Sequence, residues 1–231
     1  MRSLFTTLFG TALAVALSMP ASAQQRPVVV ELFTSQGCSS CPPADELLHA
    51  LSERDDVIAI ALHVDYWDYI GWKDEFGDPA HAERQRSYAN FANRRAIYTP
   101  EILVNGQTDI VGAKPMKLSK AIAEHKEMGP EITLDIRRDG TTLDLRAEGA
   151  SGPVEVHVLR ILPTHTTKIT RGENRGKTIT YSNIAQDLRT VDQWDGTGSY
   201  THSLTVDGDA PIVVLMQTPD GGPILAGARI D

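Results

Sequence analysis

The stretch FTSQGCSSCPPAD, residues 33–45, decides the fold prediction, because it joins a buried strand to a helix through a Cys-x-x-Cys motif. Residues 28–33 before it are apolar except for Glu31, as expected for a strand covered on both faces. Pro42 and Pro43 suit the first turn of a helix, where backbone N–H groups have no intrahelical partners. The local order is therefore strand, cysteine pair and helix start.

A second apolar strand is predicted over residues 57–64, so that the first helix connects two parallel strands in a right-handed βαβ unit. We expect further elements in the same half of the chain: a helix over 79–93, strands over 101–104 and 107–111, and a helix over 115–128. This alternation is typical of an α/β domain, to which we assign residues 24–130.

The pattern changes after residue 130, where apolar and polar residues alternate between turns rich in Gly, Asp and Pro. Strands are expected over 132–136, 143–145, 154–158, 203–206, 211–217 and 223–230. The helical spacing of Ile184, Leu188 and Val191 leaves either a helix or an irregular strand open there. We therefore expect residues 131–231 to form an all-β, sandwich-like domain that follows the α/β domain.

Composition excludes several classes of protein. The 231 residues carry 22 Lys and Arg against 30 Asp and Glu, a formal charge of −8 that gives no basic surface for nucleic acid. Two cysteines are too few for a disulfide-stabilised scaffold or for a four-cysteine zinc site.

Residues 1–23 are expected to be a signal peptide. They contain a largely apolar run and end in Ala21-Ser22-Ala23, the small-residue pattern of a cleavage site. A membrane anchor is the alternative, but polar residues interrupt the run and no basic flank follows it. We therefore predict a periplasmic or secreted protein that keeps no stable membrane anchor after cleavage, in a compartment where disulfides persist.

Cys38 and Cys41 are the strongest candidates for chemistry. Unpaired N–H groups and the helix dipole stabilise a thiolate at a helix N-terminus and lower the pKa of the thiol. We expect Cys38 to be the exposed nucleophile and Cys41 the resolving thiol. Three alternatives remain open: a static disulfide, two cysteines that merely pack together, and a copper site with Cys38, Cys41 and His63 as soft ligands.

Side chains at the ends of the two parallel strands are expected to line one crevice, because the loops that follow such strands open at the same edge. Tyr66 and Trp67 follow the second strand and are candidates for substrate binding, although aromatic residues also cap cores. His63 lies at the end of that strand, and its role is left open between a base, a metal ligand and a residue of the core. Glu31 would exchange protons with the resolving thiol if it is buried, whereas an edge position would leave it in water.

The order of strand, CxxC, helix, strand, helix, Thr-Pro, two strands and helix resembles the thioredoxin fold in its minimal form. This resemblance implies an α/β thioredoxin-like domain in which Cys38 and Cys41 are the redox pair. It implies that Pro100 is a cis-proline facing that pair, and that the backbone of Thr99 pairs with a bound substrate strand. It further implies that Glu31 is the buried acid that precedes the motif.

Three stretches taken together, residues 33–45, 63–74 and 171–174, resemble the DUF1223 family of exported bacterial proteins. The resemblance extends over essentially the whole chain after the signal peptide and implies fold and compartment, whereas that family's function is undefined. We interpret the polar, turn-rich residues 171–177 as a solvated hairpin loop. The alternatives are that this segment docks onto the first domain or binds an acidic partner.

The sequence therefore predicts an exported thiol–disulfide oxidoreductase that acts on protein or peptide thiols and disulfides and needs no cofactor. The alternatives are a copper-binding relay protein and a non-catalytic binding module that keeps the thioredoxin fold. The direction of electron flow stays open, because oxidases, reductases and isomerases use the same two thiols.

Overall fold

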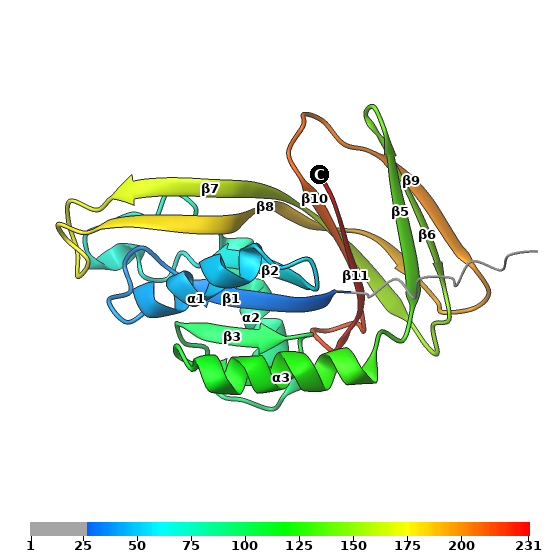
Figure 1. Ribbon diagram of the computed structural model, residues 1–231, viewed down its shortest axis with the longest axis horizontal. Coiled ribbons are helices and arrows are strands. Elements are labelled where there is room, and N and C mark those ends of the chain that lie inside the picture. Colours follow the sequence, from blue (N-terminus) through cyan, green and yellow to red (C-terminus); the bar gives the residue numbers. More distant parts are fainter. Residues whose placement is uncertain (1–26) are drawn as a thin grey trace, which may run out of the picture.

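The apolar stretch that begins at Val28 forms the central strand β1 (Val28–Thr34) in the computed structural model, which describes residues 27–231 (Figure 1). Every residue of β1 is buried, as expected for a strand with neighbours on both sides and both faces covered. Helix α1 (Pro42–Ser52) follows, and β2 (Val57–His63) returns parallel to β1, as predicted. The rest of this half consists of the 3-10 helix η1 (Asp68–Ile70), α2 (Pro79–Phe91), β3 (Glu101–Val104), β4 (Thr108–Val111) and α3 (Pro115–Met128).

The side chains of β1 alternate between two hydrophobic clusters, because successive residues of a strand face opposite sides. Val30 and Leu32 pack with residues of α1 and α3 on one face of the sheet. Val29 and Phe33 pack with residues of α2 on the other face. This alternation decides which polar side chains of β1 lie on the same face as α1.

One sheet of eight strands runs through the described part of the chain, in the order β11-β10-β7-β8-β2-β1-β3-β4. Four of these strands come from the second half: β7 (Val154–Lys168), β8 (Thr178–Trp194), β10 (Ile212–Gln217) and β11 (Ile224–Ile230). The strands of this half therefore do not form sheets separate from the first half, because four of them extend the sheet that contains β1 and β2. The physical reason is that β2 needs a partner on its outer side, and β8 supplies it.

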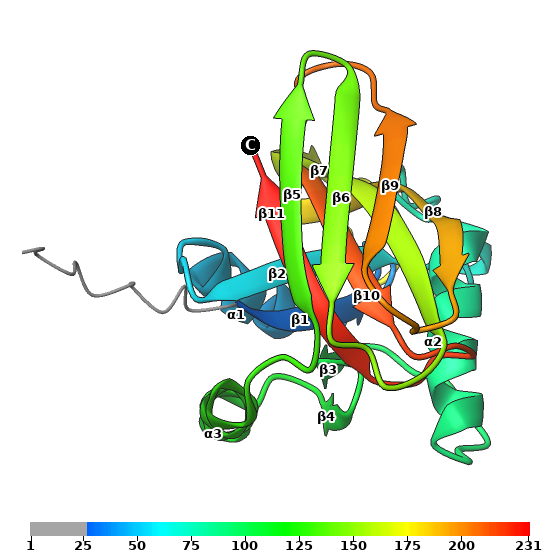
Figure 2. The same ribbon diagram turned by 90° about the vertical axis from the view of Figure 1, so that its right-hand side faces the viewer.

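The other three strands, β5 (Thr133–Asp139), β6 (Thr142–Glu148) and β9 (Tyr200–Thr205), form a second layer (Figure 2). A third hydrophobic cluster fills the space between this layer and the strands β7, β10 and β11. The alternating pattern thus produces a sandwich at this end of the molecule. Residues 27–231 form a mixed α/β, sheet-rich fold of eleven strands and three α-helices, and the division into domains at residue 130 stays a prediction.

The long hairpin of β7 and β8 departs furthest from the sequence-based expectation. Between residues 154 and 194 the sequence firmly predicts only a short strand over 154–158, yet β7 has 15 residues and β8 has 17. Residues 184–191 lie within β8 and so form the irregular strand of the two alternatives, with positive φ angles at Asn183 and Asp187. The tip of this hairpin lies at the same end of the molecule as the loop between β1 and α1 (Figure 1).

The predicted signal peptide, residues 1–23, lies outside the described residues. Within residues 27–231, no helix is both long enough and apolar enough to cross a membrane. Cleavage and localisation therefore stay predictions.

Candidate functional site

The two cysteines form a disulfide between the end of β1 and the first turn of α1. Their sulfur atoms lie 2.07 Å apart and their Cα atoms 5.4 Å apart. Cys41 is the N-cap residue of α1, and its carbonyl oxygen accepts hydrogen bonds from the backbone N–H groups of Ala44 and Asp45 at 2.8 and 3.1 Å. The helix begins with two prolines, as predicted. Cys41 therefore lies at the positive end of the helix dipole, which favours a thiolate.

Both cysteines are buried, with exposed fractions of 1% for Cys38 and 0% for Cys41. The prediction that Cys38 is exposed is therefore wrong for this oxidised state. Ser39 and Ser40 between them are exposed, so the motif reaches the surface while the cysteines do not. Segments from other parts of the chain bind the loop that carries them.

Residues 169–177, at the tip of the β7–β8 hairpin, form what we call the cover, which binds the redox loop, residues 35–41. The side-chain amide of Asn174 donates hydrogen bonds to the carbonyl oxygens of Gln36 and Cys38 at 2.9 and 2.8 Å. The segment is a hairpin loop with mostly exposed residues, as predicted, but Asn174 is buried and docks it onto the first half of the chain, which was one of the two alternatives. The physical reason is that the buried carbonyl groups of the redox loop need donors, and Asn174 brings two.

Gln36 ties the redox loop to two further segments. Its backbone N–H donates to Asp74 Oδ2 at 2.7 Å, and its side-chain oxygen accepts from Trp72 Nε1 at 2.8 Å. Its side-chain amide donates to Thr167 Oγ1, near the end of β7, at 3.2 Å. The redox loop is therefore held from both sides, by the loop that follows β2 and by the hairpin.

A cluster of buried polar side chains lies on the α1 face of the sheet. Thr34 donates to Asp45 Oδ1 at 2.8 Å, and His63 Nδ1 pairs with Asp74 Oδ2 at 2.8 Å. Thr34 and His63 are aligned in the parallel pair β1–β2, so both face α1. The ring of Tyr181 lies 4.8 Å from that of His63. Among the described residues, Asp45 Oδ2, His63 Nε2 and the Tyr181 hydroxyl have no hydrogen-bond partner.

The two buried carboxyl groups of this cluster differ in their affinity for protons. Burial raises the pKa of Asp45 to about 7, although His63 and the hydrogen bond from Thr34 act in the opposite direction. Burial also acts to raise the pKa of Asp74, but His63 and two backbone N–H groups hold that pKa below its usual range. Asp45 therefore titrates near neutral pH, one helical turn from Cys41, where it can exchange protons with a thiol.

The peptide bond between Thr99 and Pro100 is cis, as the resemblance implies. Strand β3 begins directly after Pro100 and pairs with the last residues of β1, so Pro100 lies at the sheet edge from which the redox loop departs. Trp67 connects the two loops. Its Nε1 donates to Thr99 Oγ1 at 2.7 Å, and its Cβ lies so close to Gly37 that an added methyl group there would be 3.2 Å away.

The aromatic residues after β2 divide into inner and outer members. The Tyr66 hydroxyl donates to Gln85 of α2 at 3.1 Å, which turns this side chain toward the α2 side. Tyr69 is 81% exposed and its ring stacks on that of Trp67, with centroids 6.4 Å apart. The most exposed aromatic group beside Thr99 is therefore the Trp67–Tyr69 pair, of which the sequence reasoning named only Trp67.

Glu31 is buried, which is one of the two alternatives considered for it, but it lies on the α2 face of the sheet. It accepts hydrogen bonds from Arg84 Nε at 2.7 Å and from the Tyr88 hydroxyl at 2.5 Å. Because α1 packs on the other face, the predicted proton exchange between Glu31 and Cys41 loses its geometric basis. On the α1 face, Asp45 is the buried carboxyl group that belongs to the same helix as Cys41.

The copper hypothesis finds no support in the arrangement of ligands. Within residues 27–231, no three His, Cys, Asp or Glu side chains are grouped so that they could hold a metal ion. His63 is fully buried and its Nδ1 is engaged by Asp74.

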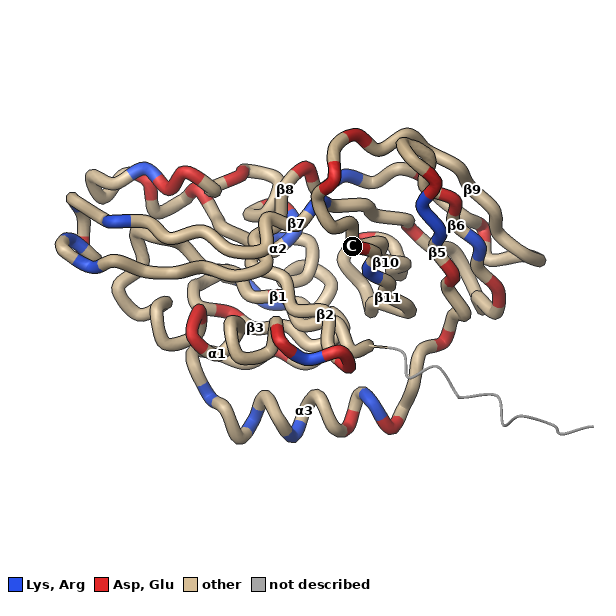
Figure 3. The backbone as a smooth tube through the Cα atoms, turned by 45° about the horizontal axis from the view of Figure 1, so that its top comes forward, with Lys and Arg blue, Asp and Glu red and all other residues tan. Residues whose placement is uncertain are grey.

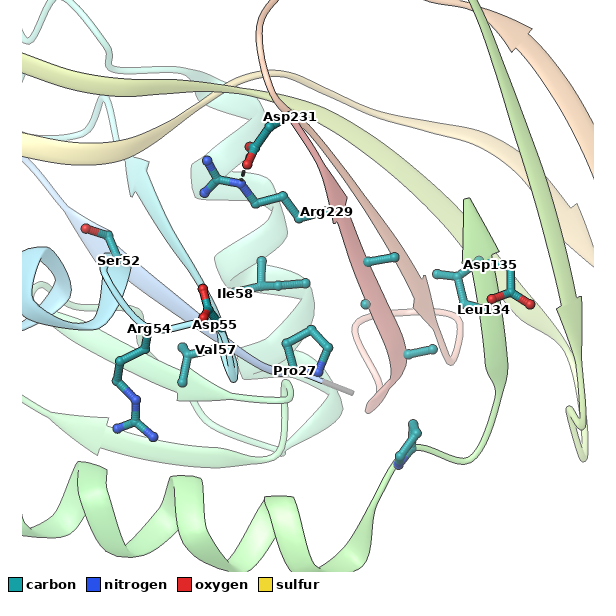
Figure 4. Close-up of a pocket in the computed structure, with 14 residues that line it drawn as sticks. Pro27, Ser52, Arg54, Asp55, Val57, Ile58, Leu134, Asp135, Arg229 and Asp231 are labelled. Atoms are coloured by element: carbon teal, nitrogen blue, oxygen red, sulfur yellow. Dashed lines mark hydrogen bonds and ion pairs between the residues drawn. The ribbon is translucent and has the colours of Figure 1, made fainter. Parts of the chain in front are cut away.

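Two cavities differ in their position relative to the disulfide. A groove of about 570 Å³, here called the α1 groove, lies between the first turns of α1 and residues 177–180, and Asp45 and His49 line it. A second cavity, of about 410 Å³, is lined by Pro27, Ile58 and Arg229 among others (Figure 4). That cavity lies at the amino ends of β1 and β2, whereas the redox loop follows the carboxyl end of β1. Of these two cavities, the α1 groove is the one beside the cysteine pair, because it is lined by Pro42, the residue that follows Cys41.

The cover and the residue before it carry more basic than acidic residues (Figure 3). The exposed charged residues of this segment are Lys168, Arg171, Glu173, Arg175 and Lys177. A chain with a net charge of −8 therefore places a local excess of positive charge beside its redox loop.

Three functional candidates escaped the sequence reasoning: Asp45, Asp74 and Asn174. A signal for Asp45 was present, because it shares the buried face of α1 with Cys41, Ala44 and Leu48 at helical spacing. Asp74 and Asn174 lie in polar loops, where local sequence gives no sign of a distant partner.

The comparisons with known proteins agree with this architecture. Residues 29–217 match the family model described as "Protein of unknown function (DUF1223)". The crystal structure of protein AGR_C_4864 from Agrobacterium tumefaciens is similar, with a TM-score of 0.78 and 30% identity, and the match covers 90% of this chain and 96% of that one. HBP35 of Porphyromonas gingivalis has a similar fold, with a TM-score of 0.65 and 14% identity over 89% of this chain and 75% of that one. Among curated proteins none matches. On the strength of the family match, which confirms the resemblance carried by residues 33–45, 63–74 and 171–174, this chain belongs to the DUF1223 family.

Proposed function

We propose that this chain is an exported thiol–disulfide oxidoreductase whose redox pair is Cys38 and Cys41. The observation that carries the proposal is a disulfide closed at the N-terminus of α1, one helical turn from the buried carboxyl group of Asp45. A disulfide that closes so short a loop constrains an unfolded chain little, so stabilisation alone is a weak reason for it. A helix N-terminus, in contrast, stabilises the thiolate that reduction releases.

We further propose that β1–β4 and α1–α3 form a thioredoxin-like module. Three observations support this: the parallel pair β1–β2, the antiparallel pairs β1–β3 and β3–β4, and the cysteine motif at the start of the intervening helix. The cis peptide bond before Pro100, at the edge from which the redox loop departs, also fits such a module.

The proposed reaction starts from the oxidised protein. A substrate thiolate attacks Cys38 Sγ, the Cys38–Cys41 bond breaks, and Cys41 leaves as a thiolate while a mixed disulfide forms on Cys38. A second substrate thiolate then attacks the substrate sulfur of the mixed disulfide and releases the Cys38 thiolate. Two electrons thus pass from a substrate dithiol to the protein, and the reverse sequence reduces a substrate disulfide.

We assign Asp45 to proton transfer at Cys41. Near neutral pH its carboxylic acid gives a proton to the leaving Cys41 thiolate, and in the reverse direction its carboxylate accepts the proton of the Cys41 thiol. Its Oδ2 has no hydrogen-bond partner among the described residues and is therefore available for this exchange. Thr34 fixes the other oxygen and so orients the group.

Protein or peptide segments are the proposed substrates. The Trp67–Tyr69 pair offers an exposed aromatic surface next to Thr99, at the sheet edge that carries the redox loop. An extended segment that pairs with the backbone at Thr99 would bring its sulfur atom toward Cys38. Export to the periplasm or beyond, after removal of residues 1–23, would supply the oxidising surroundings such chemistry uses.

The test is disulfide exchange with a model dithiol peptide, followed by thiol trapping and mass spectrometry. The oxidised protein should oxidise the peptide, and Cys38→Ser should lose this activity. Ser39→Ala, a change at an exposed position between the cysteines, should keep it and serves as the matched control. Full activity of Cys38→Ser would end the proposal. If the variant is inactive, the reduction potential of the wild-type disulfide, measured against a glutathione series, gives the direction of electron flow.

The burial of both cysteines supports a second candidate, a non-catalytic binding module with a locked disulfide. Mild reduction followed by alkylation separates the two candidates. An oxidoreductase yields alkylated Cys38 while the protein stays folded, whereas a locked module yields labelled cysteines only when it unfolds.

A further inference from the structure

We propose that the cover, residues 169–177, is a gate over the Cys38–Cys41 disulfide and that Asn174 is the positioning residue that holds it shut. This inference rests on the proposed function, because a gate has a role only if the disulfide reacts. It accounts for the fact that the cysteine proposed to be attacked is 1% exposed.

The contact of Asn174 with the redox loop is specific in direction. Its amide nitrogen donates to the carbonyl oxygens of Gln36 and Cys38, which flank Gly37, at 2.9 and 2.8 Å. Lys177 Nζ donates to the amide oxygen of the same side chain at 2.8 Å, so the amide cannot be reversed without losing all three bonds. Asn174 is itself 1% exposed, which makes these bonds more valuable than bonds at the surface.

The cover is built so that it can separate from the redox loop without losing its own structure. It is closed by internal backbone hydrogen bonds, from Ile169 to Lys177, from Gly176 to Ile169 and from Lys177 to Asn174. Within residues 27–231, the hydrogen bonds between the cover and the redox loop are the two donated by Asn174. Release of this one side chain therefore removes the direct hydrogen bonds between the cover and the redox loop, while Thr167, just before the cover, stays bonded to Gln36 and anchors the base of the hairpin.

The α1 groove marks the side from which the disulfide becomes accessible. It already separates Pro42, Asp45 and His49 of α1 from residues 177–180, which continue directly from the cover. Lifting the cover would extend this groove to the cysteines. An incoming thiolate would then reach Cys38 close to Asp45, the proposed proton donor for Cys41.

The experiment compares the rate at which dithiothreitol opens the disulfide in the oxidised, full-length protein and its variants at pH 7. Asn174→Asp keeps the shape of the side chain but replaces the donors by an oxygen that faces two carbonyl groups. Asn174→Ala removes the donors without adding charge. Thr166→Val is the matched control, because it removes the exposed hydrogen bond between Thr166 and Thr180 on the same hairpin.

We expect both Asn174 variants to react about 5- to 150-fold faster than the wild type, the range for two lost hydrogen bonds, and Thr166→Val to react within about twofold of it. Equal rates in all four proteins would overturn the gate while leaving the proposed function standing. A disulfide that stays inert in every folded variant would overturn the proposed function as well.

A measurement on the wild type keeps the inference open to refutation if the Asn174 variants fail to fold. Local opening of the cover exposes little surface, so the rate of reduction should hardly change with urea below the unfolding transition. A rate that follows the global unfolding equilibrium in its urea dependence would mean that the disulfide opens only when the protein unfolds. That result would overturn both the gate and the proposed function.

Discussion

Replacing Asp45 by Asn should make the protein more stable at alkaline pH and should remove one component of its pH dependence. Asp45 is buried beside Thr34, His63 and Asp74, and Asn keeps an oxygen that can accept the hydrogen bond from Thr34. The variant therefore changes the charge of the site and leaves its shape nearly intact.

The sign follows from the pKa of Asp45 in the two states. It is about 7 in the folded protein, raised by burial, against an ordinary value of 3.8 in the unfolded chain. Between these values the folded state holds a proton that the unfolded state has lost, so the free energy of unfolding falls as pH rises. At 1.36 kcal/mol for each pH unit, the difference between about 7 and 3.8 amounts to about 4 kcal/mol, all of it lost above pH 7.

The assay is urea unfolding of the oxidised wild type and of Asp45→Asn, followed by circular dichroism between pH 4 and pH 8. The free energy of unfolding of the variant minus that of the wild type should grow by about 4 kcal/mol over this range. Taking the difference cancels the titration of His81 and His157, whose pKa values burial lowers in both proteins. Glu46→Gln, which removes a carboxyl group at the next and exposed position of α1, is the matched control and should not reproduce this growth. A flat difference for Asp45→Asn as well would mean that Asp45 is ionised throughout, and its proposed role as proton donor at pH 7 would fail.

Two further predictions concern Glu31 and the sheet. Glu31→Gln leaves Arg84 without its buried charged partner and should lower the free energy of unfolding by about 3–5 kcal/mol in a urea titration. Because Glu31 faces α2, the same variant should leave the pH profile of disulfide exchange unchanged, whereas Asp45→Asn should shift it. A shifted profile for Glu31→Gln would mean that Glu31 takes part in the proton transfer. A fragment of residues 24–130 lacks the strands that cover the outer side of β2 and should be aggregated or unfolded in size-exclusion chromatography and circular dichroism. A monomeric fragment that unfolds cooperatively would instead establish the domain boundary at residue 130.

The local elements could be predicted from the sequence because their signals are local. The apolar run before the cysteines, the two prolines after them and the Gly129-Pro130 stop locate β1, α1 and the end of α3 to within a residue or two. The alternating pattern after residue 130 likewise gives most of the later strands. It does not say which strands pair, and so β8 beside β2 could not be foreseen.

The site was harder to predict than the elements because its residues meet over long distances in the chain. Glu31 and Thr34 differ by an odd number of positions in β1, so only one of them can face α1, yet the sequence does not say which face α1 covers. Asn174 lies among Gly and charged residues, a composition that suits a solvated turn equally well. Asn174 differs from an ordinary turn residue because its side chain binds two buried carbonyl groups of the redox loop, and this contact is known only from the three-dimensional structure.

The pairing of β8 with β2 has a consequence for the order of events while the chain folds. Cys38 and Cys41 are three positions apart and can meet as soon as the start of α1 forms, whereas Ala61 must wait for Ile184, far later in the chain. Contacts between residues so distant form late, because a large loop has to close first. We therefore expect the cysteines to be open to an oxidant early in folding and to become buried once β8 pairs with β2, so that the newly made chain can form the disulfide more readily than the folded protein can exchange it.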